Sequence, residues 1–146
     1  MPVVAHCQTD GWQVIPPWSH DFTGCALPRA QLYRADLSGY VLNDADMRYC
    51  NLRNARLIFA QCARTDFSHA DLRHANLRKI DLSNANLDYG ELSDADMSYA
   101  NLVGANLRHA TLARARLYGV TYDSSTVWPI GFDPGRLVTE GSGQSP

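Results

Sequence analysis

The side chains that could carry chemistry are scattered along this chain rather than clustered. None of the four cysteines forms a C-x-x-C pair, so the sequence indicates neither a zinc site nor a thioredoxin-type redox motif. It also contains no phosphate-binding glycine loop, no H-E-x-x-H motif and no nucleophile elbow. We therefore expect no catalytic, cofactor-binding or metal-binding residues and no enzymatic activity.

Histidines and paired carboxylates are the remaining candidates for chemistry. Their positions are His69, His74, His109, Asp44, Asp46, Asp94 and Asp96. Paired carboxylates act as general acid and base within a cleft, and histidines bind a metal only where several ligands converge. What these residues do depends on the elements that position them.

The composition narrows the class of protein. The 146 residues are 45% hydrophobic, with 13 Lys+Arg against 15 Asp+Glu and a net charge of −2, a balance that gives no general attraction to nucleic acid or anionic lipid. No apolar stretch reaches the roughly 18 residues of a membrane span, and Met1 to His6 lack the basic and apolar regions of a signal peptide. We expect one soluble, cytoplasmic domain without membrane contact.

A five-residue repeat dominates the middle of the chain, and such periods define the fold. From Leu27 to Leu117 every fifth residue is Leu, Met or Phe, except Cys62. Two residues before each of these positions stands a mostly small residue, alanine at thirteen of nineteen places. The residue between them is most often Asp or Asn. The consensus is therefore Ala-(Asp/Asn)-Leu-x-x.

A five-residue period excludes both an amphipathic helix and a straight strand. On a helix the leucines would spread around the cylinder, and on a strand they would alternate between the two faces. The chain must therefore bend once per repeat, and four right-angle bends close a coil that stacks on the next at roughly 4.8 Å. Because such a coil has convex outer faces, we interpret the aspartate pairs as turn and solubility residues and the histidines as solvated surface residues.

This pattern resembles the pentapeptide repeat family over roughly 100 of the 146 residues. The resemblance implies an all-β fold, a right-handed quadrilateral parallel β-helix of about five coils. Fold alone does not fix function, however. The resemblance also implies that the protein is free-standing and bacterial.

Stacking residues twenty apart predicts the interior. One column is Leu32, Leu52, Leu72, Leu92 and Leu112. In another, the oversized Tyr40 and Ile80 lie one coil on either side of the undersized centre at Cys62, which we interpret as volume compensation. We expect Cys25, Cys50 and Cys62 to be buried thiols that pack as small hydrophobic residues.

The flanks of the repeats should cover the two ends of the coil. All three tryptophans, Trp12, Trp18 and Trp128, lie outside the repeats, and an uncovered solenoid exposes a strand edge and its apolar interior. The boundaries we predict are 1–21 for an N-terminal cap, which includes Ile15, Pro16 and Pro17, 22–122 for the β-helix, 123–140 for a C-terminal cap and 141–146 for a disordered tail.

Stacking also turns single surface residues into columns. One edge is a row of rings, Tyr49, His69, Tyr89 and His109; another region brings together Ile58, Phe59, Tyr99 and Tyr118. Aromatic rows stabilise coil stacking by about 0.2–1 kcal/mol per pair, which is one explanation for them. The other is a partner surface, for which Ile58, Phe59 and Tyr99 beside arginine are the better candidates.

Two classes of function remain open. The first is a non-enzymatic interaction or scaffold protein that binds a protein partner or a second copy of itself. The second comes from the resemblance, because well-understood bacterial members mimic duplex DNA with a negative rod, bind DNA gyrase and protect it from toxins and quinolones. Residues 22–122 carry 12 Lys+Arg and 10 Asp+Glu, whereas a phosphate mimic should be anionic along its length. We favour the first class, and direct nucleic-acid binding is the weakest alternative.

Overall fold

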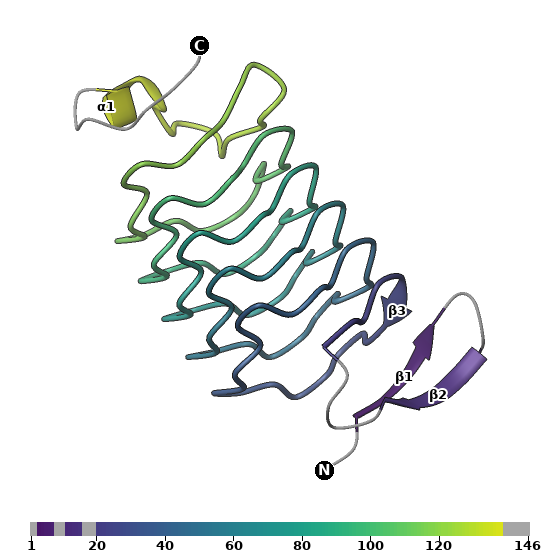
Figure 1. Cartoon of the computed structure of the whole chain (residues 1–146). Coiled ribbons are helices and arrows are strands. Elements are labelled where there is room, and N and C mark those ends of the chain that lie inside the picture. Colours follow the sequence, from purple (N-terminus) through teal and green to yellow (C-terminus); the bar gives the residue numbers. More distant parts are fainter. Residues whose placement is uncertain (1–2, 8–10, 16–19, 139–146) are drawn as a thin grey trace.

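The computed structural model describes residues 3–7, 11–15 and 20–138, and the repeat region winds as a long coil (Figure 1). We call the every-fifth-residue positions of Leu, Met or Phe the leucine register. The residue before each of these positions forms a parallel bridge with the residue twenty places later, from Asp21 with Val41 to Asn101 with Thr121. With a bridge at every fifth residue, each coil has four sides. The chain is therefore a repeat β-helix, as the five-residue period predicts.

Named strands are few because each bridge between coils is one residue wide. A hairpin of β1 (Val3–Cys7) and β2 (Gly11–Ile15) precedes β3 (Cys25–Ala26), which belongs to the first coil, and α1 (Gly135–Val138) follows the last bridge. Backbone hydrogen bonds nevertheless continue between the coils. For example, the N–H of Leu52 donates to the carbonyl of Asp71 in the next coil at 2.8 Å.

Most five-residue repeats close with a residue in the left-handed conformation. Fifteen non-glycine residues have φ between 55° and 64°, and all of them stand two positions after the leucine register. This conformation costs a residue with a Cβ roughly 1–2 kcal/mol, which the surrounding hydrogen bonds offset. One is the turn bond from the N–H of Ala55 to the carbonyl of Leu52 at 3.0 Å. Tyr49, His69, Tyr89 and Tyr99 of the surface columns occupy this outward-facing position.

The leucine and alanine registers together form one continuous core. The central column residues Leu52, Leu72 and Leu92 are each no more than 1% exposed. The residues at its two ends, Leu32 and Leu112, are only half-buried. The core is therefore fully buried in the middle of the rod and partly exposed towards each end.

The irregular column around Cys62 only partly follows the prediction. Cys62 and Ile80 are buried, as volume compensation requires. Tyr40 is instead half-buried, and its ring centre lies 5.7 Å from that of Phe22 and 4.5 Å from that of His20. The large Tyr40 side chain thus packs at the N-terminal end of the column because the aromatic residues of the first coil receive it. We assign the compensation at Cys62 to Ile80.

Two of the three repeat-region cysteines are buried free thiols, as expected. The Cys50 thiol donates to the carbonyl of Leu27 at 3.0 Å, and burial raises its pKa to about 11. Burial raises the pKa of the Cys62 thiol further. Cys25 is also buried, but the expectation of a thiol there is wrong because Cys25 is disulfide-bonded. It stands opposite Cys7 in the antiparallel pairing of β3 with β1.

We predict that Cys50 and Cys62 resist alkylation in the native protein. Only the thiolate reacts, and both thiols combine a raised pKa with complete burial. Iodoacetamide at pH 8 should label both residues only after denaturation, whereas Cys25 should also need a reductant. Peptide mapping by mass spectrometry distinguishes the three sites. Labelling of Cys50 or Cys62 in the folded protein at the rate of a free peptide thiol would contradict the prediction.

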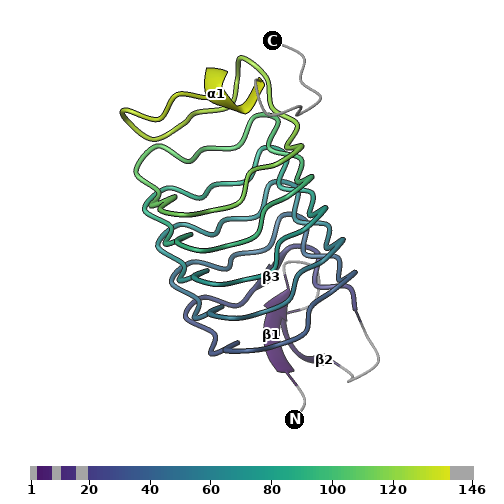
Figure 2. The same ribbon diagram turned by 90° about the vertical axis from the view of Figure 1, so that its left-hand side faces the viewer.

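The flanking elements lie at opposite ends of the coil (Figures 1 and 2). At the N-terminal end β1 pairs antiparallel with both β2 and β3. At the C-terminal end the ring of Trp128 stacks on Phe132 at 4.7 Å, and the hydroxyl of Tyr122 donates to the carbonyl of Pro134 at 3.0 Å. The predicted contributions of Pro16, Pro17, Trp18 and the tail at 141–146, and those of the Trp12 and Ile15 side chains, lie outside the described parts of the structure. The capping role of both flanks stays a prediction.

Among the described residues, no helix has the length and apolar character needed to cross a membrane.

Candidate interaction surface

The predicted surface residues lie on two different sides of the coil. Tyr49, His69, Tyr89 and His109 form one row, which we call the ring ladder. The outward-facing residues of repeats 55–59, 75–79, 95–99 and 115–119 form the second surface, which we call the basic-aromatic face. Its basic, aromatic and aliphatic members are Arg56, Ile58, Phe59, Arg78, Lys79, Tyr99, Arg116 and Tyr118, and Asp96 lies among them. In a four-sided coil these surfaces are two sides apart, and therefore opposite each other.

The rings of the ladder stack face to face between coils. Successive ring centres are 4.7, 4.9 and 4.4 Å apart, at interplanar angles of 7°, 1° and 19°. The guanidinium of Arg29 lies 4.9 Å from the centre of the Tyr49 ring and covers one end of the row. At the other end, Nδ1 of His109 lies 2.8 Å from a carboxylate oxygen of Asp88. Because stacking occupies the ring faces, the ladder offers a partner mainly ring edges and hydroxyl groups.

The basic-aromatic face instead leaves aromatic surface open. Phe59 is 60% exposed, and the ammonium of Lys79 lies 5.0 Å from its ring centre. Tyr99 and Tyr118, each about half exposed, form an edge-to-face pair at 5.4 Å. Ile58, the aliphatic member of this predicted surface, is half-buried.

Gly119 allows the Tyr99 ring to lie across the neighbouring coil. Its φ of +67° is left-handed, and a Cβ at this position would stand 2.6 Å from Cδ1 of Tyr99. A side chain at 119 would therefore displace the ring. The sequence could have indicated this contact, because Gly119 stands twenty residues after Tyr99 and therefore next to it in the adjacent coil.

Four aspartates outside the basic-aromatic face are each bound by an arginine through two hydrogen bonds. Arg48 and Arg73 each bind, through two nitrogens at 2.6 to 2.8 Å, an aspartate two residues earlier, Asp46 and Asp71. Arg64 binds Asp44, and Arg114 binds Asp94, in the same way across adjacent coils. The side-chain hydrogen bonds from these arginines lower the pKa of all four carboxyl groups.

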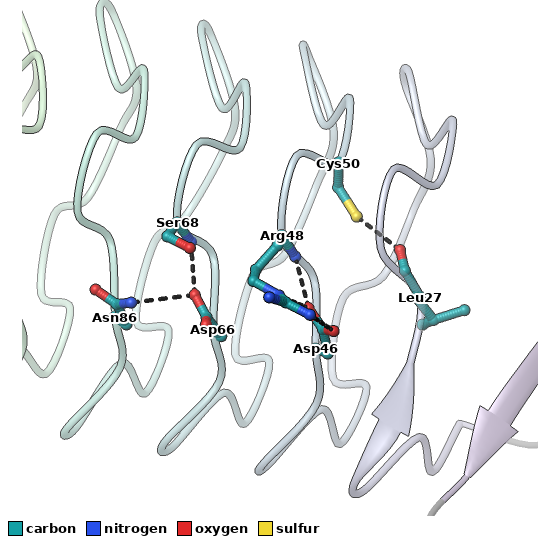
Figure 3. Close-up of polar contacts among 7 residues, drawn as sticks. All are labelled: Leu27, Asp46, Arg48, Cys50, Asp66, Ser68 and Asn86. Carbon is teal, nitrogen blue, oxygen red and sulfur yellow. Dashed lines mark hydrogen bonds and ion pairs between the residues drawn. The ribbon is translucent and has the colours of Figure 1, made fainter.

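Amide side chains form further ladders along the rod. Asp66 accepts hydrogen bonds from the backbone N–H of Ser68 at 2.9 Å and from the side chain of Asn86 at 3.2 Å, whereas Asp46 is held by Arg48 (Figure 3). These residues are the Asp or Asn of the consensus. Their side chains serve the turns and the stacking of coils, in agreement with our interpretation of the aspartates.

The described histidines do not come together as a set of metal ligands. Nδ1 of His74 lies 4.0 Å from Asp94, whose carboxylate Arg114 already binds. Within residues 20–138, no group of three His, Cys, Asp or Glu side chains is arranged to hold a metal ion. One cavity of about 390 Å³, near the C-terminal end of the coil, is lined in part by Leu117, Phe132 and Leu137. None of the predicted surface residues lines it.

Acid is expected to destabilise the protein below about pH 4. Hydrogen bonds from Arg48 and Arg73 lower the pKa of Asp46 and Asp71 from 3.8. A carboxyl group with a lowered folded-state pKa stabilises the fold above its unfolded-state pKa, and this stabilisation is lost as the pH falls through the folded-state pKa. The melting temperature, followed by circular dichroism, should stay level from pH 7 to pH 5 and fall from pH 4 to pH 2. The double variant Asp46→Asn, Asp71→Asn should show a shallower fall; the same slope as wild type would contradict the assignment.

Comparisons with known proteins agree with this fold. The family model for pentapeptide repeats matches in eight copies, over residues 21–54, 41–72, 50–88, 65–98 and 91–121. Comparison with curated proteins gives no match.

Three solved structures illustrate the range of similarity. The pentapeptide repeat protein Rfr23 from the cyanobacterium Cyanothece 51142 is 28% identical, with 75% of this chain and 91% of that chain covered and a TM-score of 0.64. The protein alr5209 from Nostoc PCC 7120 is 31% identical, with 87% and 86% covered and a TM-score of 0.42. A trypsin-treated form of QnrB1, a plasmid-mediated fluoroquinolone resistance protein, is 18% identical, with 86% and 78% covered and a TM-score of 0.42.

These similarities differ in what they support. The likeness to Rfr23 supports the repeat β-helix, whereas the likeness to QnrB1 is too low to carry an argument about function. Because the family model matches from residue 21 to residue 121 of 146, this chain belongs to the pentapeptide repeat family.

Proposed function

We propose that this protein is a non-enzymatic interaction protein that binds a protein partner through its basic-aromatic face. The supporting observation is the exposure of Phe59: 60% of its side chain is open to solvent, beside Lys79. Tyr99 lies two coils further along the same column. An aromatic ring with so much exposed surface contributes little to the core. Aromatic residues and arginine are enriched among the residues that contribute most binding energy in interfaces.

The rigidity of the coil favours this function. Backbone hydrogen bonds link each repeat to its neighbours, so the side chains of the basic-aromatic face keep a fixed spacing along the rod. A preorganised surface loses little conformational entropy when a partner binds. The ring ladder lacks this advantage as a binding surface because its ring faces already contact one another.

The charges count against the alternative of a DNA mimic that binds gyrase. Phosphate mimicry needs carboxylates that project unpaired negative charge along the rod. Here Asp44, Asp46, Asp71 and Asp94 each accept two hydrogen bonds from an arginine.

A homodimer through the basic-aromatic face is a special case of the proposed function, with a second copy as the partner.

Binding that depends on this one face tests the proposal. The tagged protein and the variant Ile58→Ala, Phe59→Ala, Tyr99→Ala would be compared in affinity capture, and each captured protein would be purified and its binding measured by calorimetry. The matched control, Tyr49→Ala, His69→Ala, Tyr89→Ala, changes three residues of the opposite surface. We expect the first variant to weaken binding at least tenfold, as truncation of an interface centre does, and the control to bind within about twofold of wild type.

Two further measurements separate the alternatives. Sedimentation of wild type and the face variant shows whether the partner is a second copy. A gyrase supercoiling assay, with and without a quinolone, tests the DNA-mimic alternative. Partner binding that is equal in wild type and the face variant, or relief of quinolone-stabilised cleavage by both proteins, would overturn the proposal.

A further inference from the structure

The basic-aromatic face carries an excess of positive charge on a protein whose net charge is −2. Its four cations are Arg56, Arg78, Lys79 and Arg116. The carboxylates that contact this group are Asp36, 3.8 Å from Arg56, and Asp96, 3.9 Å from Arg116. Within the part of the chain that the structure describes, Arg78 and Lys79 form no ion pair.

The two cations without a carboxylate lie between the two aromatic groups. Position 79 follows position 59 by one coil and precedes position 99 by one coil, so Lys79 stands in one column with Phe59 and Tyr99. Arg78 is its neighbour and lies two coils from Tyr118. The order along the rod is therefore aromatic, cationic, aromatic, with roughly 4.8 Å between successive coils.

From this arrangement we propose that the basic-aromatic face binds an acidic peptide segment of its partner, with carboxylates against Arg78 and Lys79 and apolar side chains against Phe59 and the Tyr99–Tyr118 pair. This inference rests on the proposed function and names the chemistry of the partner. The ammonium of Lys79 is already held over the Phe59 ring at 5.0 Å, which places the positive charge beside the apolar contact.

A peptide fits these charges better than a nucleic acid does. A nucleic acid needs a continuous row of cations to neutralise successive phosphates. At both ends of this face the arginines stand beside carboxylates, Asp36 and Asp96, which would repel a continuing phosphate backbone. A short acidic segment needs only the central pair of cations.

Fluorescence anisotropy with defined probes tests the inference. The acidic probe is fluorescein-labelled Gly-Phe-Glu-Asp-Leu-Glu-Asp-Phe-Gly, and its neutral counterpart has Gln and Asn in place of Glu and Asp. A labelled twelve-residue oligothymidylate tests nucleic acid. The variant Arg78→Glu, Lys79→Glu reverses the central charges, and Arg34→Glu, Arg108→Glu is a charge-matched control on other sides of the rod. Circular dichroism confirms that each variant is folded.

We expect the acidic peptide to bind wild type at least tenfold more tightly than the neutral peptide. Reversal of the central charges should remove that difference, and the control variant should retain it within about twofold, because only nearby charges act strongly in salt. Equal binding of the two peptides, unchanged binding by the Arg78→Glu, Lys79→Glu variant, or tighter binding of the oligothymidylate would overturn the inference.

The two proposals can fail separately. If Phe59 and Tyr99 are required for the natural partner while the acidic probe shows no preference, the proposed function stands and its acidic partner does not. If the acidic probe binds through Arg78 and Lys79 but no partner depends on the face in the capture experiment, the proposed function fails instead.

Discussion

The substitution Leu72→Ala is expected to lower the free energy of unfolding by about 2–5 kcal/mol, the range for buried leucines. Leu72 is 1% exposed and lies in the centre of a column of identical residues, with Leu52 and Leu92 buried on either side. The coils are held at a fixed spacing by their backbone hydrogen bonds. The neighbouring coils therefore cannot move closer together to fill the cavity that the missing methyl groups leave.

Two variants in the same column provide matched controls. Leu32 and Leu112 occupy the same register and the same side of the coil, but both are half-buried. Substitution by alanine at these ends should cost clearly less than at Leu72, since less apolar surface is withdrawn from water. Urea denaturation followed by circular dichroism measures all three. Equal losses at Leu32, Leu72 and Leu112 would show that burial along the column does not set the cost.

Restoring the repeat consensus with Cys62→Leu is expected to destabilise the protein by about 1–3 kcal/mol, the usual cost of overpacking a core. Cys62 is fully buried, and Ile80, in the following coil on the same side, takes a place where the repeat usually has alanine. The larger Ile80 side chain occupies volume that a leucine at 62 would need. A variant closer to the consensus should thus be less stable than wild type.

The double variant Cys62→Leu, Ile80→Ala tests this explanation. If the two side chains share one volume, the double variant should recover stability relative to Cys62→Leu alone, and the two substitutions should be non-additive. Urea denaturation of wild type, both single variants and the double variant gives the coupling free energy. Additive effects, or a stabilised Cys62→Leu variant, would refute volume compensation between Cys62 and Ile80.

The five-residue period was sufficient to predict the features that depend on stacking. A step of twenty residues places His69 between Tyr49 and Tyr89, and the rings stack there at 4.7 and 4.9 Å. The same step predicts the buried leucine column. These predictions hold because each coil repeats the backbone of the previous one, so position in the repeat determines both neighbours and orientation.

Side-chain pairing could not be predicted because the repeat offers several partners at similar distances. Arg64 reaches Asp44 in the adjacent coil, whereas Arg48 turns back to Asp46 in its own repeat. Both choices are compatible with the sequence, and the rotamer decides between them. The sequence therefore could not predict that, among the described residues, other cations pair with the nearby carboxylates while Arg78 and Lys79 do not; the structure was needed to see this.

The disulfide at Cys25 was missed for a different reason. Cys25 pairs through β3 with β1, an antiparallel contact outside the twenty-residue period, so the spacing of the cysteines gave no signal. Disulfides are typical of proteins from oxidising compartments. The cytoplasmic location expected from the sequence stays a prediction.

The pairing at the two ends of the coil bears on whether copies of the protein can join into fibres. Bridges between coils are parallel and twenty residues apart, but β1 meets β3 antiparallel, and the last bridge, Asn106 with Val127, spans twenty-one residues. A one-residue change of register sends side chains to the opposite face of a strand. We therefore expect the first or last coil of another copy not to continue the same winding at either end, and the rods not to polymerise end to end.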